Sequence, residues 1–307
     1  MDFFFNVLTQ VIILLLLVLL GVILTKTKLL TESGVKSMTD VVLYIVTPCV
    51  IIKSFMREFD HSLVKNLLLS FLIAILAHIL FIVLSILLLR SKDIKKQTVL
   101  RFGSVFSNCG FMSIPLQQAI LGDMGVFYGS SYIAIFNLFI WSYGILLMSG
   151  DKKYLTPKKL ILNPGIIGVA IGIIIFFFSI PVPTVLNQTV SYMASLNTPV
   201  PMIIIGYHLA NSNLLQGLKD LKCLWSIFAR LFLFPVAALV IMYLCKIKGI
   251  ILISSVIACS APVAAITTMF SSKFEQDTAL SVNMVSISTV LSLISMPILI
   301  TIAQYFA

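Results

Sequence analysis

Residues 107–116, with the sequence SNCGFMSIPL, place polar and helix-weakening residues inside a strongly apolar part of the chain. Pro115 has no amide hydrogen and its ring clashes with the preceding helical turn, while Gly110 has a low helix propensity. A helix that breaks here leaves a half-helix whose first N–H groups and partial positive charge suit a carboxylate. Asn108 adds a side-chain amide that can donate to a carboxylate or accept from a hydroxyl. The stretch therefore predicts an anion site built from Asn108, Cys109, Gly110, Phe111 and Pro115.

Residues 259–268, with the sequence CSAPVAAITT, contain a second predicted interruption, at Pro262. An unpaired backbone group in hydrocarbon costs several kcal/mol, so a non-helical stretch persists only where protein or water covers it. We therefore expect the two interruptions to lie against each other, with Ser260, Ala261 and Pro262 completing the site. A packing kink is the alternative interpretation of a proline in a membrane helix.

The elements that position these interruptions must be membrane helices. The 307 residues are 60% hydrophobic and only 10% charged, with a mean hydropathy of +1.11, whereas about a quarter of the residues of a soluble domain are charged. A spanning helix needs about 20 apolar residues. Ten stretches meet this requirement: about 3–24, 35–56, 64–89, 97–120, 124–148, 160–180, 184–212, 222–245, 249–271 and 276–304. The predicted fold class is an all-α integral membrane protein with ten transmembrane helices.

The formal charge of +10 would suggest a nucleic-acid partner in a soluble protein, but the placement of the basic residues explains it differently. Fifteen of the 21 basic residues fall in loops on one side of the ten spans, and five fall on the other. By the positive-inside rule, the richer side is cytoplasmic. We therefore expect a multi-pass protein of the cell membrane, in contact with lipid and not with nucleic acid, with both termini outside.

The N-terminus and the cysteines add two further expectations. The first apolar run has no basic region before it and is too long for a signal peptide, so it is expected to remain as a span. The five cysteines show no CxxC spacing and are expected to be small core residues. Neither a metal site nor a cofactor is expected.

The two halves of the chain carry matching landmarks. A shift of 151 residues places Thr47-Pro48 on Thr198-Pro199, and residues 108–111 on 259–262. The matching features weaken helices at equal depth, so Pro48 and Pro199 are expected to break helices in the part of the protein that surrounds the site. Coincidence among residues that are common in membrane helices is the alternative.

If this repeat is real, residues 1–150 and 151–307 each contribute five spans. An odd number of spans forces the second copy to enter the membrane upside down, which gives an inverted-topology repeat. Many secondary transporters have this architecture, and their substrate site lies near the membrane midplane, where interrupted helices of the two copies meet.

Two blocks of the sequence resemble a known family. Residues 108–116, NCGFMSIPL, are similar to the fourth-span signature of the auxin efflux carriers, a family that includes bacterial permeases for malate and related acids. Residues 261–299 resemble the C-terminal block of the same family, including its Ser- and Thr-rich tenth span. The segments TPCVIIKSF and NPGIIG are further similar pieces, so the resemblance extends over nearly the whole chain.

The resemblance implies a fold like that of bile acid and sodium/proton transporters, with two five-span inverted repeats and crossed, broken helices four and nine. Spans one, two, six and seven would form a scaffold that often dimerises, and spans three to five and eight to ten a transport domain. The implied substrates are small organic anions such as malate, with a proton or a sodium ion as a possible coupling partner.

Charged residues in or near the predicted spans are further candidates for functional roles. All eleven acidic residues fall in loops or near span ends, which argues against a carboxylate-based sodium/proton antiporter. Glu275 and Asp277 are candidates for coupling or gating, against the alternative of a solvated helix N-terminus. Arg230 lies inside the eighth span, where an unpaired charge is costly. It could clamp a substrate carboxylate, or it could reach the headgroups or cap the carbonyls of a broken helix.

Two polar residues inside spans each have a functional and a packing interpretation. His78, in the third span, titrates in a range that suits proton coupling, but a single membrane histidine is more often a hydrogen-bonded packing residue. Asn137, in the fifth span, could line the substrate cavity or serve only packing.

The leading hypothesis is a secondary active transporter of a small organic anion that works by alternating access. An intramembrane enzyme would need a nucleophile with a base or a metal-ligand motif such as HExxH, and the three histidines are too scattered for either. A membrane sensor that binds a ligand without transporting it, or an ion-coupled carrier of a solute that is not a carboxylate, are the alternatives.

Overall fold

The computed structural model describes residues 2–155, 162–211 and 217–307. Within these residues the structure is helical throughout and has no β-strand beyond one isolated bridge. Six helices are long and apolar enough to cross a membrane: Val7–Lys26, Glu32–Phe55, His61–Leu88, Cys109–Ser149, Leu221–Leu244 and Thr278–Phe306. The prediction of an all-helical membrane protein is therefore confirmed.

The first half of the chain forms helices that follow the predicted spans closely. They are α1 (Asp2–Lys26), α2 (Glu32–Val41), η1 (Val42–Val46), α3 (Thr47–Phe55), α4 (His61–Leu88), α5 (Ile94–Val105), η2 (Cys109–Ser113), α6 (Ile114–Phe139), η3 (Ile140–Gly144), α7 (Ile145–Ser149) and the short 3₁₀ turn η4 (Lys152–Tyr154). Inside α6, Gly122 has φ 62° and ψ −156°, so the helix breaks there. This break separates the predicted fourth and fifth spans, and glycine reaches that conformation without the penalty of a side chain.

The described part of the second half contains α9 (Pro164–Phe177), α10 (Thr184–Ser195), α11 (Pro199–Ala210), α13 (Leu221–Phe228), η5 (Ala229–Leu233), α14 (Phe234–Leu244), α15 (Gly249–Ser260), α16 (Ile266–Lys273) and α17 (Thr278–Phe306). Three predicted spans, 97–120, 184–212 and 249–271, are each divided into shorter helices. The start of the predicted sixth span, at residue 160, lies outside the described residues. The total of ten spans therefore stays a prediction.

Three of the four widened, π-helical turns in the described residues lie just before a proline. The turns η1, η2 and η5 end directly before Thr47-Pro48, Ile114-Pro115 and Phe234-Pro235. Proline removes one amide donor and its ring pushes against the preceding turn, so the helix widens there. The predicted helix break at Pro48 is wrong, because Glu32–Phe55 continues as one helical run in which the turn before Pro48 is only widened. Pro199 does follow an interruption, since α10 ends at Ser195 and α11 begins at Pro199.

Two glycines let α1 and α11 cross at very short range. A Cβ atom on Gly206 would lie 2.2 Å from the carbonyl oxygen of Val18. A Cβ atom on Gly21 would lie 2.3 Å from the carbonyl oxygen of Ile203. Small residues at a membrane-helix contact allow this approach of two backbones. Any side chain at either position would force α1 and α11 apart.

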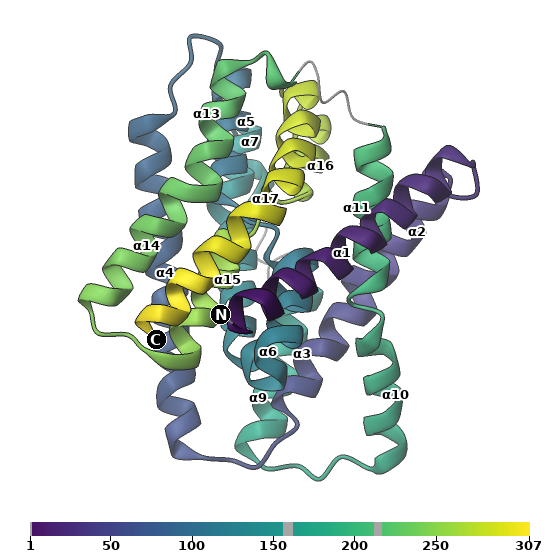
Figure 1. The fold of residues 1–307 in the computed structure, drawn as a ribbon, viewed down its shortest axis with the longest axis vertical. Helices are drawn as coiled ribbons and strands as arrows, with labels where there is room; N and C mark the ends of the chain where they lie inside the picture. Colours follow the sequence, from purple (N-terminus) through teal and green to yellow (C-terminus); the bar gives the residue numbers. More distant parts are fainter. Residues whose placement is uncertain (1, 156–161, 212–216) are drawn as a thin grey trace.

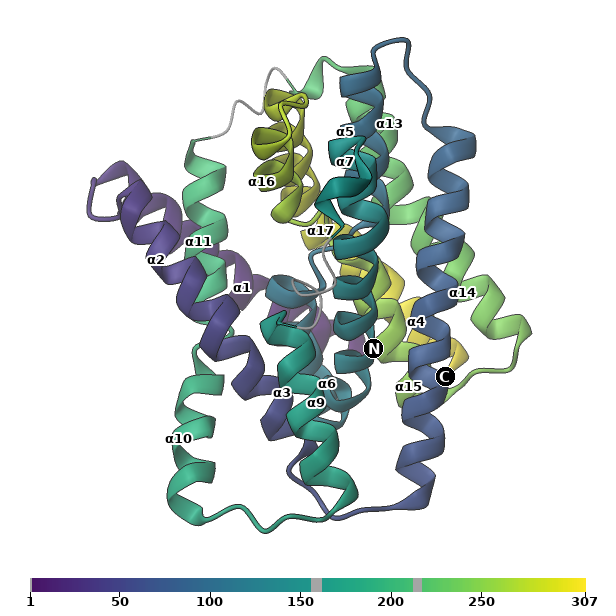
Figure 2. The same ribbon diagram turned by 180° about the vertical axis from the view of Figure 1, so that it is seen from behind.

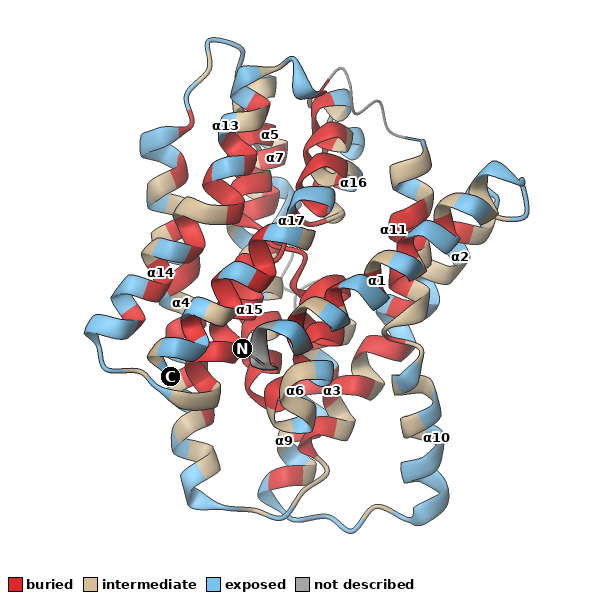
Figure 3. Ribbon diagram, viewed as in Figure 1, coloured by how far each residue is buried: buried red, intermediate tan, exposed pale blue. Residues whose placement is uncertain are grey.

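The helices are arranged around a buried centre. In Figures 1 and 2, α4, α13 and α14 lie on one side of the molecule and α2, α10 and α11 on the other. Figure 3 shows the buried residues concentrated in the middle, around α15, α6 and the adjoining part of α17, while α10 is mostly exposed. Large apolar side chains cover the outer faces, such as Leu16, Leu68 and Tyr192 with exposed fractions of 59%, 63% and 75%. This exposed apolar surface suits contact with lipid tails.

Candidate functional site

Two interrupted helices meet through their backbones. Helix α5 ends at Val105 and α15 ends at Ser260, and each continues as a non-helical segment before the next helical turn. The N–H of Asn108 donates to the carbonyl oxygen of Pro262 at 2.7 Å, and the N–H of Ala264 donates to that of Phe106 at 3.0 Å. These two bonds enclose an antiparallel bridge between residues 107 and 263. Each interruption therefore satisfies backbone groups of the other, as a buried non-helical segment requires.

Helix α17 covers this paired segment. The hydroxyl of Ser288 accepts a hydrogen bond from the N–H of Val263 at 3.1 Å. Ser288 is fully buried. This contact gives the backbone N–H of Val263 an acceptor that the pairing of the two interruptions does not provide.

A pocket lies beside the pairing, with the side chain of Asn108 in its wall. Asn108 is 6% exposed, and its Nδ2 atom is buried without a hydrogen-bond partner. The pocket is small and open to solvent, and its lining residues come from both interruptions and from α11 and α17. These residues are Asn108, Phe111, Ile204, Ile205, His208, Leu209, Ala265, Val285, Ser286 and Thr289. The walls are mainly apolar, and Asn108, His208, Ser286 and Thr289 supply the polar side chains.

The first turn of η2 opens beside Asn108. The first N–H groups of a helical segment have no partner within it, and those of Gly110 and Phe111 belong to this turn. A Cβ atom on Gly110 would meet nothing within 4 Å, so there is free space next to the turn. The first backbone donors of η2 thus follow Asn108 directly in the chain, and Gly110 has open space beside it.

The remaining predicted residues of the two interruptions shape the backbone and do not line this pocket. Cys109 is buried at the start of η2, and its N–H donates to the carbonyl oxygen of Ser107 at 2.8 Å. Pro115 follows η2 near the start of α6. Ser260 ends α15 with its hydroxyl on the carbonyl oxygen of Ile257. Ala261 is fully buried in the apolar core, and Pro262 supplies the carbonyl that Asn108 uses.

Arg230 lies where three helices meet, and its guanidinium contacts backbone carbonyls. Its Nη1 atom donates to the carbonyl oxygens of Ser104 and Val105 at 3.0 and 3.2 Å, and its Nη2 atom donates to that of Cys259. Arg230 is fully buried and is absent from the residues that line the pocket. The structure thus favours the second of the two roles considered from the sequence, a cap on broken-helix carbonyls.

His78 and Asn137 both hydrogen-bond within their own helices. The Nδ1 atom of His78 lies 2.8 Å from the carbonyl oxygen of Ala74, and its ring stacks on Phe139. Asn137 donates through Nδ2 to the carbonyl oxygen of Ile133 at 2.9 Å. Neither lines the pocket beside Asn108. The Nε2 atom of His78 is buried without a hydrogen-bond partner, and a coupling role of His78 and a substrate contact of Asn137 stay predictions.

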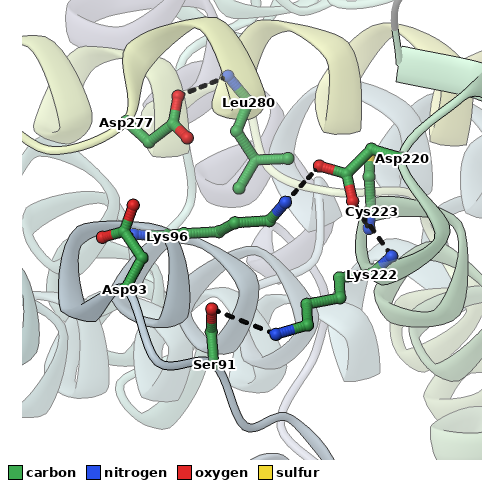
Figure 4. A network of polar contacts seen from close by, with 8 residues as sticks. All are labelled: Ser91, Asp93, Lys96, Asp220, Lys222, Cys223, Asp277 and Leu280. Carbon is green, nitrogen blue, oxygen red and sulfur yellow. Dashed lines mark hydrogen bonds and ion pairs between the residues drawn. The ribbon is translucent and has the colours of Figure 1, made fainter.

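The acidic candidates near the start of α17 lie away from the pocket. Asp277 caps α17 by accepting the N–H of Leu280 at 2.9 Å, and Glu275 is exposed, with φ 52°. Figure 4 shows Asp277 at the edge of a polar network in which Lys96 pairs with Asp220 at 2.5 Å. The solvated helix N-terminus is therefore the arrangement observed, and a gating role for either acid stays a prediction.

Of the pocket residues on α11 and α17, the sequence draws attention only to His208, as a membrane histidine that more often serves packing than proton coupling. Ser286 and Thr289 sit among several buried hydroxyl residues of α17, including Ser281, Ser288 and Ser292. A run of hydroxyl residues in a membrane helix is a usable signal for a face turned toward protein, but it does not distinguish the pocket-lining members from the others. Among the described residues, no group of three or more His, Cys, Asp or Glu could hold a metal ion.

These features define a helical membrane protein with two interrupted helices joined at a small, largely apolar pocket. The family model for membrane transport proteins matches residues 6–300. The chain therefore belongs to this family, the auxin efflux carrier family that its motifs resemble.

Two archaeal relatives extend this assignment. An uncharacterized transporter of Methanothermobacter thermautotrophicus is 26% identical over 288 residues, covering 92% of this chain and 94% of the relative. An uncharacterized transporter of Methanocaldococcus jannaschii is 26% identical over 297 residues, with the same coverage. Both alignments span almost the full length of each protein, so the similarity covers the helices that form the site.

Proposed function

We propose that this protein is a secondary active transporter that carries a small organic anion, such as malate or a related carboxylate, across the cell membrane. The observation that carries the proposal is the unpartnered Nδ2 of Asn108 in the pocket wall, beside the paired interruptions. A buried amide donor without a partner is costly, and a carboxylate oxygen would remove that cost.

The pocket offers polar groups for the carboxylate of the solute and apolar side chains for its carbon chain. One carboxylate oxygen accepts from Asn108, and the free N–H groups of the first turn of η2 support the same negative charge. Ser286 offers a hydroxyl toward a second polar group of the solute, and Phe111 and Ile204 contact its carbon chain. The Thr289 hydroxyl donates to the carbonyl oxygen of Val285, so it can only accept a hydrogen bond from the solute. Arg230 is not part of this contact set, because its guanidinium is held by backbone carbonyls.

Transport follows from the arrangement of the proposed repeats. Helices α1, α2–α3, α9 and α10–α11 correspond to the scaffold spans, and the remaining helices to a mobile transport domain. The pocket lies between α11 of the scaffold and α17 with the interruptions of the transport domain. Movement of one part against the other would expose the pocket to each side in turn. The protein would have ten spans, with both termini outside the cell.

Uptake of labelled malate and related acids into proteoliposomes tests this function. Flux is expected for at least one acid in the wild type and is expected to be lost in Asn108→Ala. Asn187→Ala is the matched control, because Asn187 lies exposed on α10 and outside the pocket. Binding of an acid without flux in folded protein would indicate a sensor. Flux that is unaffected by Asn108→Ala would contradict the proposed site.

A further inference from the structure

The carbonyl groups that hold Arg230 come from the ends of two separate helices. Ser104 and Val105 are the last residues of α5, and Cys259 belongs to the last turn of α15. In each helix, the last carbonyls have no partner within the helix and carry the negative end of the helix dipole. Arg230 donates to all three of these carbonyls.

The positive charge of Arg230 balances the partial negative charges at the C-terminal ends of α5 and α15. A helix C-terminus is equivalent to about −0.5 elementary charge, so two of them present about −1 to a group between them. The guanidinium of Arg230 supplies +1. No carboxylate among the described residues forms an ion pair with it, since the ion pairs there are Lys96–Asp220 and Lys153–Asp151. The two helix ends therefore act as the counter-charge of Arg230.

A cluster of carbonyl oxygens at converging helix ends is also the kind of site that binds an alkali cation. In membrane transporters with interrupted helices, the C-terminal ends of half-helices and unwound carbonyls coordinate coupling ions, and carbonyl oxygens replace the hydration shell of such ions. We propose that Arg230 is a tethered cation that fills a monovalent-cation site formed by the carbonyl oxygens of Ser104, Val105 and Cys259.

The rest of the side chain is held so that the guanidinium stays in this place. The guanidinium lies over the ring of Phe81, with its carbon 5.2 Å from the ring centre. Arg230 lies on the widened turn η5, which precedes Phe234-Pro235. A planar guanidinium bonds two helix ends at once, which a lysine ammonium does less well. A sodium gradient then has no vacant site at these carbonyls through which it could drive transport.

The test replaces Arg230 and asks whether a free cation takes its place. The purified Arg230→Gln variant is melted in sodium, potassium and choline chloride at equal ionic strength, without added solute. We expect its Tm to be higher in sodium or potassium than in choline, by about 3 °C or more. The wild type and Arg230→Lys keep the tethered charge, so each should melt at the same temperature in the three salts.

Arg101→Gln is the matched control. Arg101 also caps a helix, since its Nε and Nη2 atoms donate to the carbonyl oxygens of Leu89 and Ile86 at the end of α4. It contacts one helix end only and is not fully buried, so no cation dependence is expected.

Three outcomes would overturn the proposal. The first is a Tm of Arg230→Gln that does not differ between the salts. The second is a sodium- or potassium-specific stabilisation of the wild type. The third is an Arg230→Gln protein that cannot be recovered folded in either alkali salt, because a free cation is then unable to replace the guanidinium. No transported solute enters the measurement, so its result does not depend on the proposed organic-anion transport.

Discussion

The backbone N–H of Asn108 donates a 2.7 Å hydrogen bond to the carbonyl oxygen of Pro262, a residue from the other half of the chain. Proline suits this position because it has no N–H of its own that would need a partner in a buried, extended segment. Pro262, which lies two residues beyond the end of α15, thereby supplies the acceptor for the backbone N–H of Asn108. The Nδ2 atom of Asn108 has no hydrogen-bond partner, and Asn108 is one of the residues that line the pocket.

Pro262→Ala should lower uptake by about tenfold or more, which corresponds to about 1.4 kcal/mol. Alanine permits α15 to continue as a helix, and the carbonyl of residue 262 would then turn away from Asn108. Initial rates in proteoliposomes measure this change. Pro183→Ala is the control, because Pro183 is exposed directly before α10 and far from the pairing in sequence and structure. Wild-type rates in Pro262→Ala would show that the pairing does not need proline.

Ser288→Ala should destabilise the protein by about 1–3 kcal/mol, because it leaves the buried N–H of Val263 without its acceptor. Thermal melting in detergent measures the loss. Ser142→Ala is the control, since the Ser142 hydroxyl is exposed and bonds only to carbonyls of its own helix. Equal melting temperatures of the two variants would contradict the role given to Ser288.

Gly206→Ala should also destabilise the protein, by about 1–3 kcal/mol, because the new methyl group would overlap the carbonyl of Val18. The melting temperature again measures the effect. Gly34→Ala is the control, because a Cβ there would lie 3.4 Å from its nearest neighbour, an ordinary contact distance. A Gly206→Ala protein as stable as wild type would mean that α1 and α11 can separate without cost.

Gly110→Ala should leave the melting temperature almost unchanged, because a Cβ at this position meets no atom within 4 Å. Its methyl group would occupy the free space beside Asn108, so uptake of an organic anion should weaken. The expected signature is a raised KM with an unchanged Tm. An unchanged KM would indicate that the solute does not approach the first turn of η2.

Asp220→Asn should lower stability at neutral pH by about 0.2–1 kcal/mol. Burial alone would raise the pKa of Asp220, but the hydrogen bond and charge of Lys96 and the amides of Lys222 and Cys223 outweigh it and hold this pKa below the ordinary value of 3.8. Asparagine keeps the helix cap, so the variant isolates the charge.

The pH dependence of this effect has a defined sign. A lowered folded-state pKa means that the carboxylate stabilises the folded protein at pH values above 3.8, and that this contribution falls as the pH drops through the folded-state value. The difference in Tm between wild type and Asp220→Asn should therefore shrink on acidification. A constant difference from neutral pH down to the folded-state pKa would contradict the ion pair as its source.

The helix interruptions could be located from the sequence because proline and glycine act on the backbone directly. Pro115, Gly110 and Pro262 each weaken a helix wherever it is placed, so the breaks followed without any tertiary information. The break at Gly122 falls between two predicted spans, whose boundary the apolar pattern of the sequence sets. Which carbonyl pairs with which amide could not be derived, since it depends on how two segments from different halves approach each other.

The environment of single side chains was harder to derive. The sequence showed that Arg230 needed a partner, but a carboxylate solute, the headgroups and the backbone were all able to serve. Only the positions of α5 and α15 identify the carbonyls that it contacts. Ser288 is likewise one of several serines on α17, and the sequence of α17 does not show which of them accepts the hydrogen bond from Val263.

The bridge between residues 107 and 263 also bears on how the molecule can move. Each interruption taken alone would be a hinge, since the backbone there lacks the restraint of a continuous helix. Fastened to one another by two amide–carbonyl bonds, they bend only together. The backbone around Asn108 is therefore held in shape by the paired segment, and any movement of the helices against one another would have to be taken up by loops and contacts outside this pairing.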